Sequence, residues 1–250
     1  MAEPIPEIEP IEPIKNRKQP AWTLWLAAGG LVIFLCATVF IGILVFAAPN
    51  FMEKILPDSI RPADELKREI TQGNTMGDPG APIHMIEYGD FQCPYCLKFW
   101  NETEPLLIEE YVNTGIVYFE YRSIGEFLGA ESAWAAEGAY CAGDQGKFWE
   151  YHDTLYANWT GENVGDFTRE KLIQYAEAIM LDMDTFETCL SAGKHKGTVE
   201  QDAAEAEADG VHATPTFIIN GTKIEGAQPF KVIKHILEEI LEGDLDTVIG

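Results

Sequence analysis

Residues 21–48 read "AWTLWLAAGGLVIFLCATVFIGILVFAA", a run of 28 residues without a charged side chain. As an α-helix this run would be about 42 Å long at roughly 1.5 Å per residue, whereas the hydrocarbon core of a bilayer is about 30 Å thick. The run therefore predicts a transmembrane helix. A cleaved secretory signal is the alternative, because small residues end the run. We favour a retained anchor, since the apolar part of a signal spans only about 7–15 residues.

The basic residues beside this helix predict its orientation. Lys15, Arg17 and Lys18 precede the helix, whereas the residues just after it carry no excess of positive charge. The cytoplasmic flank of a membrane helix is the one that carries the excess of Lys and Arg. We therefore expect a cytoplasmic N-terminus and an extracytoplasmic portion that begins after Asn50.

Composition divides the rest of the chain into three parts. Residues 1–20 repeat Glu-Pro and Ile-Pro, a pattern that denies helical hydrogen bonds and predicts a disordered cytoplasmic tail. Residues 49–80 are interrupted by prolines and predict a spacer with one short helix near residues 63–71. A folded domain over residues 81–245 should follow.

The charge and the hydrophobic content bound the possible functions. The formal net charge is −24, and 46% of the residues are hydrophobic. Such a negative surface repels phosphate backbones, so nucleic-acid binding is disfavoured. The hydrophobic share is large enough for a buried core.

Two cysteines separated by two residues lie in the stretch "YGDFQCPYCLKFW". An apolar run at residues 83–88 predicts a strand before them, and residues 116–122 predict a second strand after them. Cys93 and Pro94 should begin the helix between these strands, because proline is favoured in a first helical turn. Pro105 lies inside the helical pattern and should kink it. The result is a β-α-β unit with the cysteine pair at the helix N-terminus.

The N-terminus of a helix is a suitable place for a reactive cysteine. The thiolate is the form that attacks disulfides, and a free cysteine with a pKa near 8.5 is mostly protonated at neutral pH. Backbone N–H groups and the positive end of the helix dipole stabilise the anion. The first residue of such a helix is exposed and the fourth turns toward the protein. We therefore predict Cys93 as the nucleophile and Cys96 as the resolving thiol.

Three other roles for this pair agree less well with the sequence. A zinc site needs two further ligands, but Cys141 and Cys189 are solitary and the histidines show no paired spacing. A purely structural disulfide stays open in an oxidising compartment, although it would close almost no loop. Copper carriage would require a cluster of Met or His residues. Redox chemistry is the leading interpretation, and no bound metal is expected.

The chain after the second strand favours helices until a final β-rich region. No convincing strand is found between Arg122 and about Gly210. Residues 214–220 then predict a strand, Asn220-Gly221 is a strong hairpin signal, and residues 229–241 predict an amphipathic helix. The helices expected in between span residues 129–141, 146–159, 168–181, 184–191 and 194–209.

Three motifs in this order resemble those of one family. The stretches "GDPGAPIHMIEYGDFQCPYCLKFW", "CAGDQGKFWEYHDTLY" and "GVHATPTFIINGTKIEGAQPF" look like the DsbA-like thiol-disulfide oxidoreductases of bacterial cell envelopes, particularly the membrane-anchored subgroup. The resemblance covers about residues 77–241. It implies an α/β, thioredoxin-like fold in the order βαβ, helical insertion (about residues 123–210), ββα, here preceded by a single transmembrane helix.

The resemblance also implies roles for residues around the cysteines. In the family, the proline that matches Pro215 is cis and lies beside the redox pair, where the preceding backbone can pair with a substrate chain. That preceding residue, here Thr214, influences reactivity. The alternative is a trans proline at the start of an edge strand, since only about 5–6% of X-Pro bonds in folded proteins are cis. The dipeptide Pro94-Tyr95 corresponds to the one that tunes the redox potential.

Glu87 is a further candidate for a catalytic role. It falls on a strand that is expected to be buried on both faces, where a lone carboxylate should have a raised pKa. The family often has a carboxylate near this place that assists proton transfer from the buried cysteine. The alternative is a glutamate at the strand edge that reaches water.

Cys141 and Cys189 are predicted to form a second, structural disulfide. Cysteines left over outside the membrane tend to pair, and some DsbA-like proteins have such a bridge in the insertion. A loop of about 49 residues would give roughly 4 kcal/mol of stabilisation. The alternative is two buried free thiols.

Together these features predict a membrane-tethered, extracytoplasmic thiol-disulfide oxidoreductase that introduces disulfides into exported proteins. The resemblance implies reduced or misoxidised exported proteins as substrates and a membrane-embedded, quinone-linked partner that reoxidises the enzyme. No cofactor is expected. A disulfide reductase or isomerase with the same site is one alternative. A metal-binding or chaperone-like envelope protein without turnover is another.

Overall fold

The computed structural model describes residues 66–243, which belong to one compact unit, Ile60–Gly250. The predicted tail (residues 1–20), the predicted transmembrane helix (residues 21–48) and most of the predicted spacer lie outside these residues. Within the described residues, no helix is both long enough and apolar enough to cross a bilayer.

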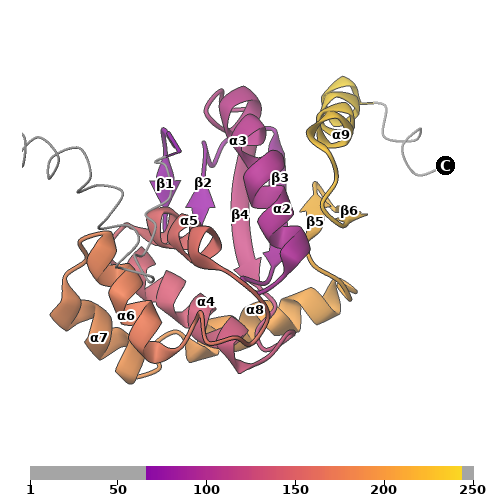
Figure 1. Cartoon of the computed structure of the whole chain (residues 1–250). Coiled ribbons are helices and arrows are strands. Elements are labelled where there is room, and N and C mark those ends of the chain that lie inside the picture. The colour runs from indigo at the N-terminus through magenta and orange to yellow at the C-terminus, as the bar shows by residue number, and fades with distance from the viewer. Residues whose placement is uncertain (1–65, 244–250) are drawn as a thin grey trace, which may run out of the picture. The chain divides into compact units, whose positions relative to one another are not determined.

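A six-stranded mixed sheet forms the centre of the domain, in the order β1-β2-β4-β3-β5-β6 (Figure 1). Only β3 and β4 run parallel, and the helix between them is the one that carries the cysteine pair. The other pairs of neighbours are antiparallel. The strands are β1 (Thr71–Gln72), β2 (Thr75–Met76), β3 (Ile83–Gly89), β4 (Val117–Ser123), β5 (Thr216–Ile219) and β6 (Thr222–Glu225).

Strand β3 is buried because it has a strand on either side and helices over both faces. Met85 and Tyr88 point to opposite faces of the sheet, and both are fully buried. On the Met85 face, Phe99 of α2 (Pro94–Glu102) lies with its ring centroid 4.6 Å from that of Phe217. On the other face, Tyr88 packs in a small cluster with Ala206 of α8. The apolar run in the sequence thus predicted a central strand correctly.

The helix that follows the cysteines is interrupted, as the proline in its sequence predicted. Helix α2 ends at Glu102, and the chain continues as α3 (Glu104–Leu107) and a π-helix, η1 (Ile108–Val112). Pro105 lies in the first turn of α3, where its missing N–H needs no partner. The break therefore falls just before the proline.

Five helices follow β4 before the chain returns to the sheet at β5. Helix α4 contacts each of the other four, and α8 also contacts β4. Figure 1 shows α6 and α7 farthest from β6, and α8 running beneath the sheet toward β5. The predicted order of βαβ, helices and ββα is confirmed. Their bounds are α4 (Ala130–Gly143), α5 (Phe148–Asn158), α6 (Arg169–Ala178), α7 (Met183–Ser191) and α8 (Lys196–Ala208), and α9 (Phe230–Glu242) closes the domain.

The N-terminal edge of the sheet differs from the prediction. A helix near residues 63–71 and a domain start near Ala81 were expected, but residues 66–70 are not helical, and β1 and β2 form a hairpin. This hairpin extends the sheet, because Met76 of β2 pairs with Phe119 of β4 and is fully buried. Each strand is two residues long, which is too short for any periodicity to reveal. The free edge of β4 is what makes these residues extended.

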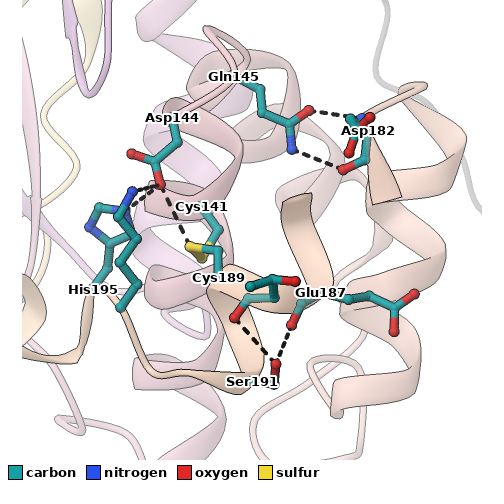
Figure 2. Close-up of a disulfide and its surroundings, with 10 residues drawn as sticks. Cys141, Asp144, Gln145, Asp182, Glu187, Cys189, Ser191 and His195 are labelled. Carbon is teal, nitrogen blue, oxygen red and sulfur yellow. Dashed lines mark hydrogen bonds and ion pairs between the residues drawn. A yellow bond between two sulfur atoms is a disulfide. The ribbon is translucent and has the colours of Figure 1, made fainter. Parts of the chain in front are cut away.

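The predicted disulfide between Cys141 of α4 and Cys189 of α7 is present, with Cα atoms 5.9 Å apart (Figure 2). Beside it, Asp144 Oδ2 accepts hydrogen bonds from Lys194 Nζ and from His195 Nε2, each at 2.8 Å. The same oxygen lies 3.6 Å from the Cys189 sulfur. This last contact is not a hydrogen bond, since a disulfide sulfur carries no proton.

Candidate active site

The turn before α2 sets the position of Cys93. The side chain of Asp90 is buried and its Oδ1 accepts a hydrogen bond from the backbone N–H of Gln92 at 2.8 Å, while its Oδ2 accepts one from the backbone N–H of Leu128 at 3.2 Å. The Cys93 N–H donates to the backbone oxygen of Asp90 at 2.9 Å. Cys93 is the N-cap of α2 and Pro94 is the first helical residue. The turn is thus held from both sides and presents the Cys93 sulfur at the helix N-terminus.

The two cysteine thiols are free and differ in burial less than the sequence suggested. Cys96 is fully buried, as predicted, but Cys93 is only 5% exposed rather than open to solvent. The intervening Tyr95 is 62% exposed, so the surface lies directly beside the pair. The prediction of an exposed Cys93 was wrong because a loop from far along the chain packs against it. Cys93 Sγ lies 3.4 Å from the backbone oxygen of Thr214.

The surroundings shift the pKa values of the two thiols in opposite directions. A hydrogen bond from the Cys96 thiol is the largest cause that lowers the pKa of Cys93, to about 6, against the opposing effect of burial. Thr214 and the backbone amides of Tyr95 and Cys96 lower it further. Burial raises the pKa of Cys96 well above its ordinary value, and the neighbouring Cys93 adds to the shift. At neutral pH, Cys93 is therefore mostly a thiolate and Cys96 a thiol.

The peptide bond between Thr214 and Pro215 is cis, as predicted. It lies at the start of β5, next to the Cys93 sulfur, although 120 residues separate the two in sequence. The Pro215 backbone oxygen accepts a hydrogen bond from the N–H of Gly226 at 2.8 Å, which ties this loop to the end of β6. The structure thus brings the four predicted residues Cys93, Cys96, Thr214 and Pro215 together.

Glu87 is buried in the middle of the sheet and does not reach water. It is 2% exposed and lies between Tyr121 of β4 and Phe217 of β5. Its Oε2 atom has no hydrogen-bond partner among the described residues. Burial raises the pKa of Glu87 well above its ordinary value, and the charges of Glu104 and Cys93 raise it further. The alternative of a glutamate at a solvated strand edge is excluded.

A buried ionic cluster behind the site was not predicted. The Arg68 guanidinium donates to both carboxylate oxygens of Asp153, at 2.7 and 2.9 Å, and to Glu104 Oε1 at 3.0 Å. Trp100 Nε1 also donates to Asp153, at 2.9 Å. These charges are far apart in the sequence, so no local pattern joins them. One signal was available, because Glu104 falls on the same helical stripe as Trp100 and the apolar Ile108.

Two groups of three possible metal ligands occur in residues 66–243, and neither contains Cys93 or Cys96. One consists of Cys141, Cys189 and His195. The two cysteine sulfurs of this group are joined to each other in the disulfide. The other consists of Glu104, His152 and Asp153, where the Arg68 guanidinium already supplies the positive charge.

The geometry agrees with comparisons against known proteins. A family model described as thioredoxin matches residues 70–239. The chain belongs to the thioredoxin family. Two solved structures share the fold of this domain. BdbD from Bacillus subtilis in its oxidised form matches with a TM-score of 0.64 at 24% identity, covering 73% of this chain and 100% of that one. α-DsbA1 from Wolbachia pipientis matches with a TM-score of 0.60 at 23% identity, covering 73% of this chain and 98% of that one.

Curated relatives of the thioredoxin domain carry two kinds of name. A Na(+)/H(+) antiporter NhaA 3 from Salinispora tropica is 35% identical over 151 residues, which cover 60% of this chain but only 22% of the antiporter. A probable disulfide bond formation protein D from Bacillus anthracis is 29% identical over 202 residues, covering 78% of this chain and 88% of that protein. The chain thus spans a small part of the antiporter relatives and most of the disulfide-formation relative.

Proposed function

We propose that this protein is a membrane-tethered thiol-disulfide oxidoreductase that introduces disulfides into exported proteins. The observation that carries the proposal is the opposite shift of the two thiol pKa values, which makes Cys93 a thiolate and keeps Cys96 protonated at neutral pH. The name of the Bacillus anthracis relative supports the same chemistry. Cys93 is the nucleophile in this proposal, and Cys96 is the resolving thiol.

The reaction starts from a disulfide between Cys93 and Cys96. A substrate thiolate attacks the Cys93 sulfur, the bond between the two cysteines breaks, and Cys96 leaves with the electron pair and takes up a proton. A second substrate thiolate then attacks the substrate sulfur of the mixed disulfide. Cys93 leaves as a thiolate, the substrate gains a disulfide, and the enzyme retains two electrons.

The stabilised thiolate favours the oxidising direction. A lower pKa of Cys93 stabilises the reduced enzyme at neutral pH, and a stable reduced form makes the oxidised form a stronger oxidant. The same residues would serve a reductase or isomerase if the oxidised form were the more stable one. The equilibrium reduction potential therefore decides between these functions.

Neighbouring residues have defined roles in this proposal. The Thr214 backbone lies against the Cys93 sulfur beside the cis Pro215, where an extended substrate segment can pair with it. Pro94 and Tyr95 tune the potential, since they lie between the two cysteines and the backbone N–H of Tyr95 stabilises the Cys93 thiolate. Glu87, with its raised pKa, supplies and removes the proton of Cys96.

The location belongs to the same proposal. The uncharged run at residues 21–48 would anchor the protein, with residues 1–20 in the cytoplasm and the thioredoxin domain outside. A membrane-embedded, quinone-linked partner would accept the two electrons. Fractionation of cells, with protease added to spheroplasts, tests this topology. Degradation of the domain in intact spheroplasts is expected, and its protection would contradict an extracytoplasmic site.

The central experiment uses the full-length protein in detergent micelles. Its Cys93–Cys96 couple is equilibrated with glutathione, and it is then given a reduced, unfolded protein with several cysteines. We expect a potential near the oxidising end of the family scale, about −120 mV, and oxidation of the substrate. A reduction potential of about −270 mV would favour a reductase. No disulfide transfer in either direction would favour the metal-binding or chaperone-like alternative.

Single replacements separate the roles of the two cysteines. Cys93→Ser should abolish transfer, because no Cys93–Cys96 disulfide can form for the substrate thiolate to attack. Given a substrate that contains a disulfide, Cys96→Ser should accumulate mixed disulfides between Cys93 and substrate, detectable by non-reducing electrophoresis. The Cys93 thiolate attacks the substrate disulfide, one substrate thiolate leaves, and no Cys96 thiol remains to resolve the product. Full activity in both variants would overturn the assignment.

A further inference from the structure

Gln92 comes directly before Cys93, and it is fully buried although glutamine is mostly a surface residue. Its Oε1 accepts a hydrogen bond from the backbone N–H of Asn163 at 2.6 Å, and its Nε2 donates to Ser132 Oγ at 2.9 Å. Burying an amide costs free energy unless its polar atoms are bonded. Both bonds go to segments outside the turn before α2, so the side chain joins that turn to other parts of the chain.

The contacts of Gln92 belong to a closed ring of hydrogen bonds around the active-site turn. Asn163 Nδ2 donates to the Leu128 backbone oxygen at 2.7 Å. The Leu128 N–H donates to Asp90 Oδ2 at 3.2 Å, and Asp90 Oδ1 accepts from the Gln92 N–H at 2.8 Å. The ring thereby joins three segments that are far apart in the sequence, namely the turn at residues 90–93 and the loops at residues 124–129 and 159–168.

The backbone at two positions is adapted to this contact between loops. Asn163 has a φ of 53°, in the left-handed region that asparagine adopts more readily than most residues. Gly129 has a φ of 134°, and a Cβ atom there would overlap with Asn163 Oδ1. A side chain at residue 129 would therefore push the second loop off the first. Such conformations persist only where surrounding contacts hold them.

The segments around the reactive sulfur each present one large apolar side chain to solvent. Tyr95 is 62% exposed, Phe127 49% and Val164 60%. Phe127 and Val164 are immediate neighbours of ring residues, and consecutive Cα atoms are only about 3.8 Å apart. Apolar side chains gathered at one place on a surface mark an interaction site. A substrate chain that is joined to the reactive sulfur in a mixed disulfide has to lie beside them.

We propose that Gln92 is a positioning residue that holds the loops carrying Phe127 and Val164 against the active-site turn, and so sets a preference for protein thiols over small thiols. This inference rests on the proposed function. The occupant of the surface is an unfolded segment of the protein substrate, with its cysteine on Cys93 and its apolar side chains against the two loops. Glutathione has no apolar side chain for the loops to bind.

The test gives the oxidised full-length protein two reductants, a reduced unfolded protein with several cysteines and glutathione. Acid quenching, alkylation and mass spectrometry follow the loss of the Cys93–Cys96 disulfide. Gln92→Met removes the amide and keeps an unbranched side chain of similar length. We expect the rate constant with the unfolded protein, divided by that with glutathione, to fall about 5- to 10-fold, as when an interface side chain is displaced.

A second variant opens the ring at another point. Asn163→Gly keeps the left-handed backbone and the N–H that Gln92 accepts, but it loses the bond to the Leu128 oxygen. It should lower the same ratio. Urea unfolding of both variants establishes that each is folded under the assay conditions.

Gln145→Met is the matched control, because Gln145 also joins two loops through its amide. Its Nε2 donates to the Asp182 backbone oxygen at 3.1 Å, and its Oε1 accepts from the Asp182 N–H at 2.8 Å (Figure 2). These loops belong to the helical insertion and not to the ring. The variant should keep the ratio within about twofold of the wild-type value, because additivity leaves distant sites uncoupled.

The exposed side chains are tested separately from the ring. The double variant Phe127→Ser with Val164→Ser should lower the ratio without disturbing the buried amide. In that background, Gln92→Met should have a smaller further effect than in the wild type, because the loops no longer carry the side chains that it positions.

The outcomes distinguish this inference from the proposed function. A wild-type ratio in folded Gln92→Met and Asn163→Gly would overturn the inference alone. So would equal losses with glutathione and with the unfolded protein, or a loss of the same size in Gln145→Met. A wild-type protein that cannot exchange disulfides with either reductant would overturn the proposed function and this inference with it.

Discussion

Cys93 and Cys96 both lie at the N-terminus of α2, but their thiols differ sharply in acidity. Cys93 receives hydrogen bonds from the Cys96 thiol and from backbone amides, whereas Cys96 is enclosed by the core. Hydrogen bonds to the charged form lower a thiol pKa, and burial raises it. For Cys93 the first effect exceeds the second. For Cys96 burial dominates, so only one of the two sulfurs is reactive at neutral pH.

The reduced protein should therefore show one thiol that titrates below neutrality. We expect the rate of alkylation of Cys93 by iodoacetamide to rise with a midpoint near pH 6, while Cys96 stays unreactive. Mass spectrometry of peptides identifies the modified residue at each pH. The Cys96→Ala variant should shift the midpoint of Cys93 upward, because the largest stabilising hydrogen bond is removed. A wild-type midpoint near pH 9 would contradict the proposed site.

Glu87 should make the stability of the oxidised protein depend on pH. Its pKa in the folded state lies above its ordinary value of 4.5. The stability is therefore unaffected by Glu87 below about pH 4.5 and falls as pH rises above that value, by roughly 1.4 kcal/mol per pH unit. Glu87→Gln should flatten this dependence above about pH 4.5 in urea unfolding. Parallel curves for the two proteins would contradict the buried, protonated carboxyl group.

Among the helices and strands, local signals predicted those that bury a regular face. The proline at the start of α2, the apolar stripe along the following turns and the Asn220-Gly221 turn between β5 and β6 are all visible in the sequence. The hairpin of β1 and β2 has no such signal. Its strands exist because β4 offers an unpaired edge, and that edge exists only once the sheet has formed.

The disulfide between α4 and α7 should stabilise the insertion without taking part in catalysis. Its residues are 48 positions apart, and the chain-entropy estimate for such a loop is about 4 kcal/mol. We expect the double variant Cys141→Ala with Cys189→Ala to lose about 2–4 kcal/mol in urea unfolding and to keep disulfide transfer by the folded protein. Unchanged stability would contradict this role. Loss of transfer in a folded double variant would show that the bridge also acts on the active site.

In the domain as a unit, the Arg68 cluster joins three distant segments. Arg68 lies before β1, Glu104 in α3 and Asp153 in α5, and all three side chains are at most 6% exposed. Against the effect of burial, a hydrogen bond from His152 and the charge of Arg68 lower the pKa of Asp153 to about 2. The cluster thus fastens the segment before β1 to helices α3 and α5.

Removing this arginine should be strongly destabilising. Arg68→Met keeps an apolar stem but leaves the Glu104 and Asp153 carboxylates buried without their cation. Breaking a buried ion pair in this way costs about 3–5 kcal/mol, to be measured by urea unfolding at pH 7. Lys67→Met is the matched control, because Lys67 is exposed and pairs only with the exposed Glu69. Similar unfolding curves for the two variants would contradict a structural role for the cluster.

The sequence by itself determined the βαβ–helices–ββα order and the cysteine pair at the start of α2. These follow from spacing, periodicity and turn residues that act over a few neighbouring positions. Only the tertiary structure decided the burial of Cys93 and Glu87, the hairpin on β4, the Arg68 cluster and the meeting of Phe91 with Tyr156. Each of these joins residues from distant segments. Their contacts arise when the chain packs, so no local pattern records them.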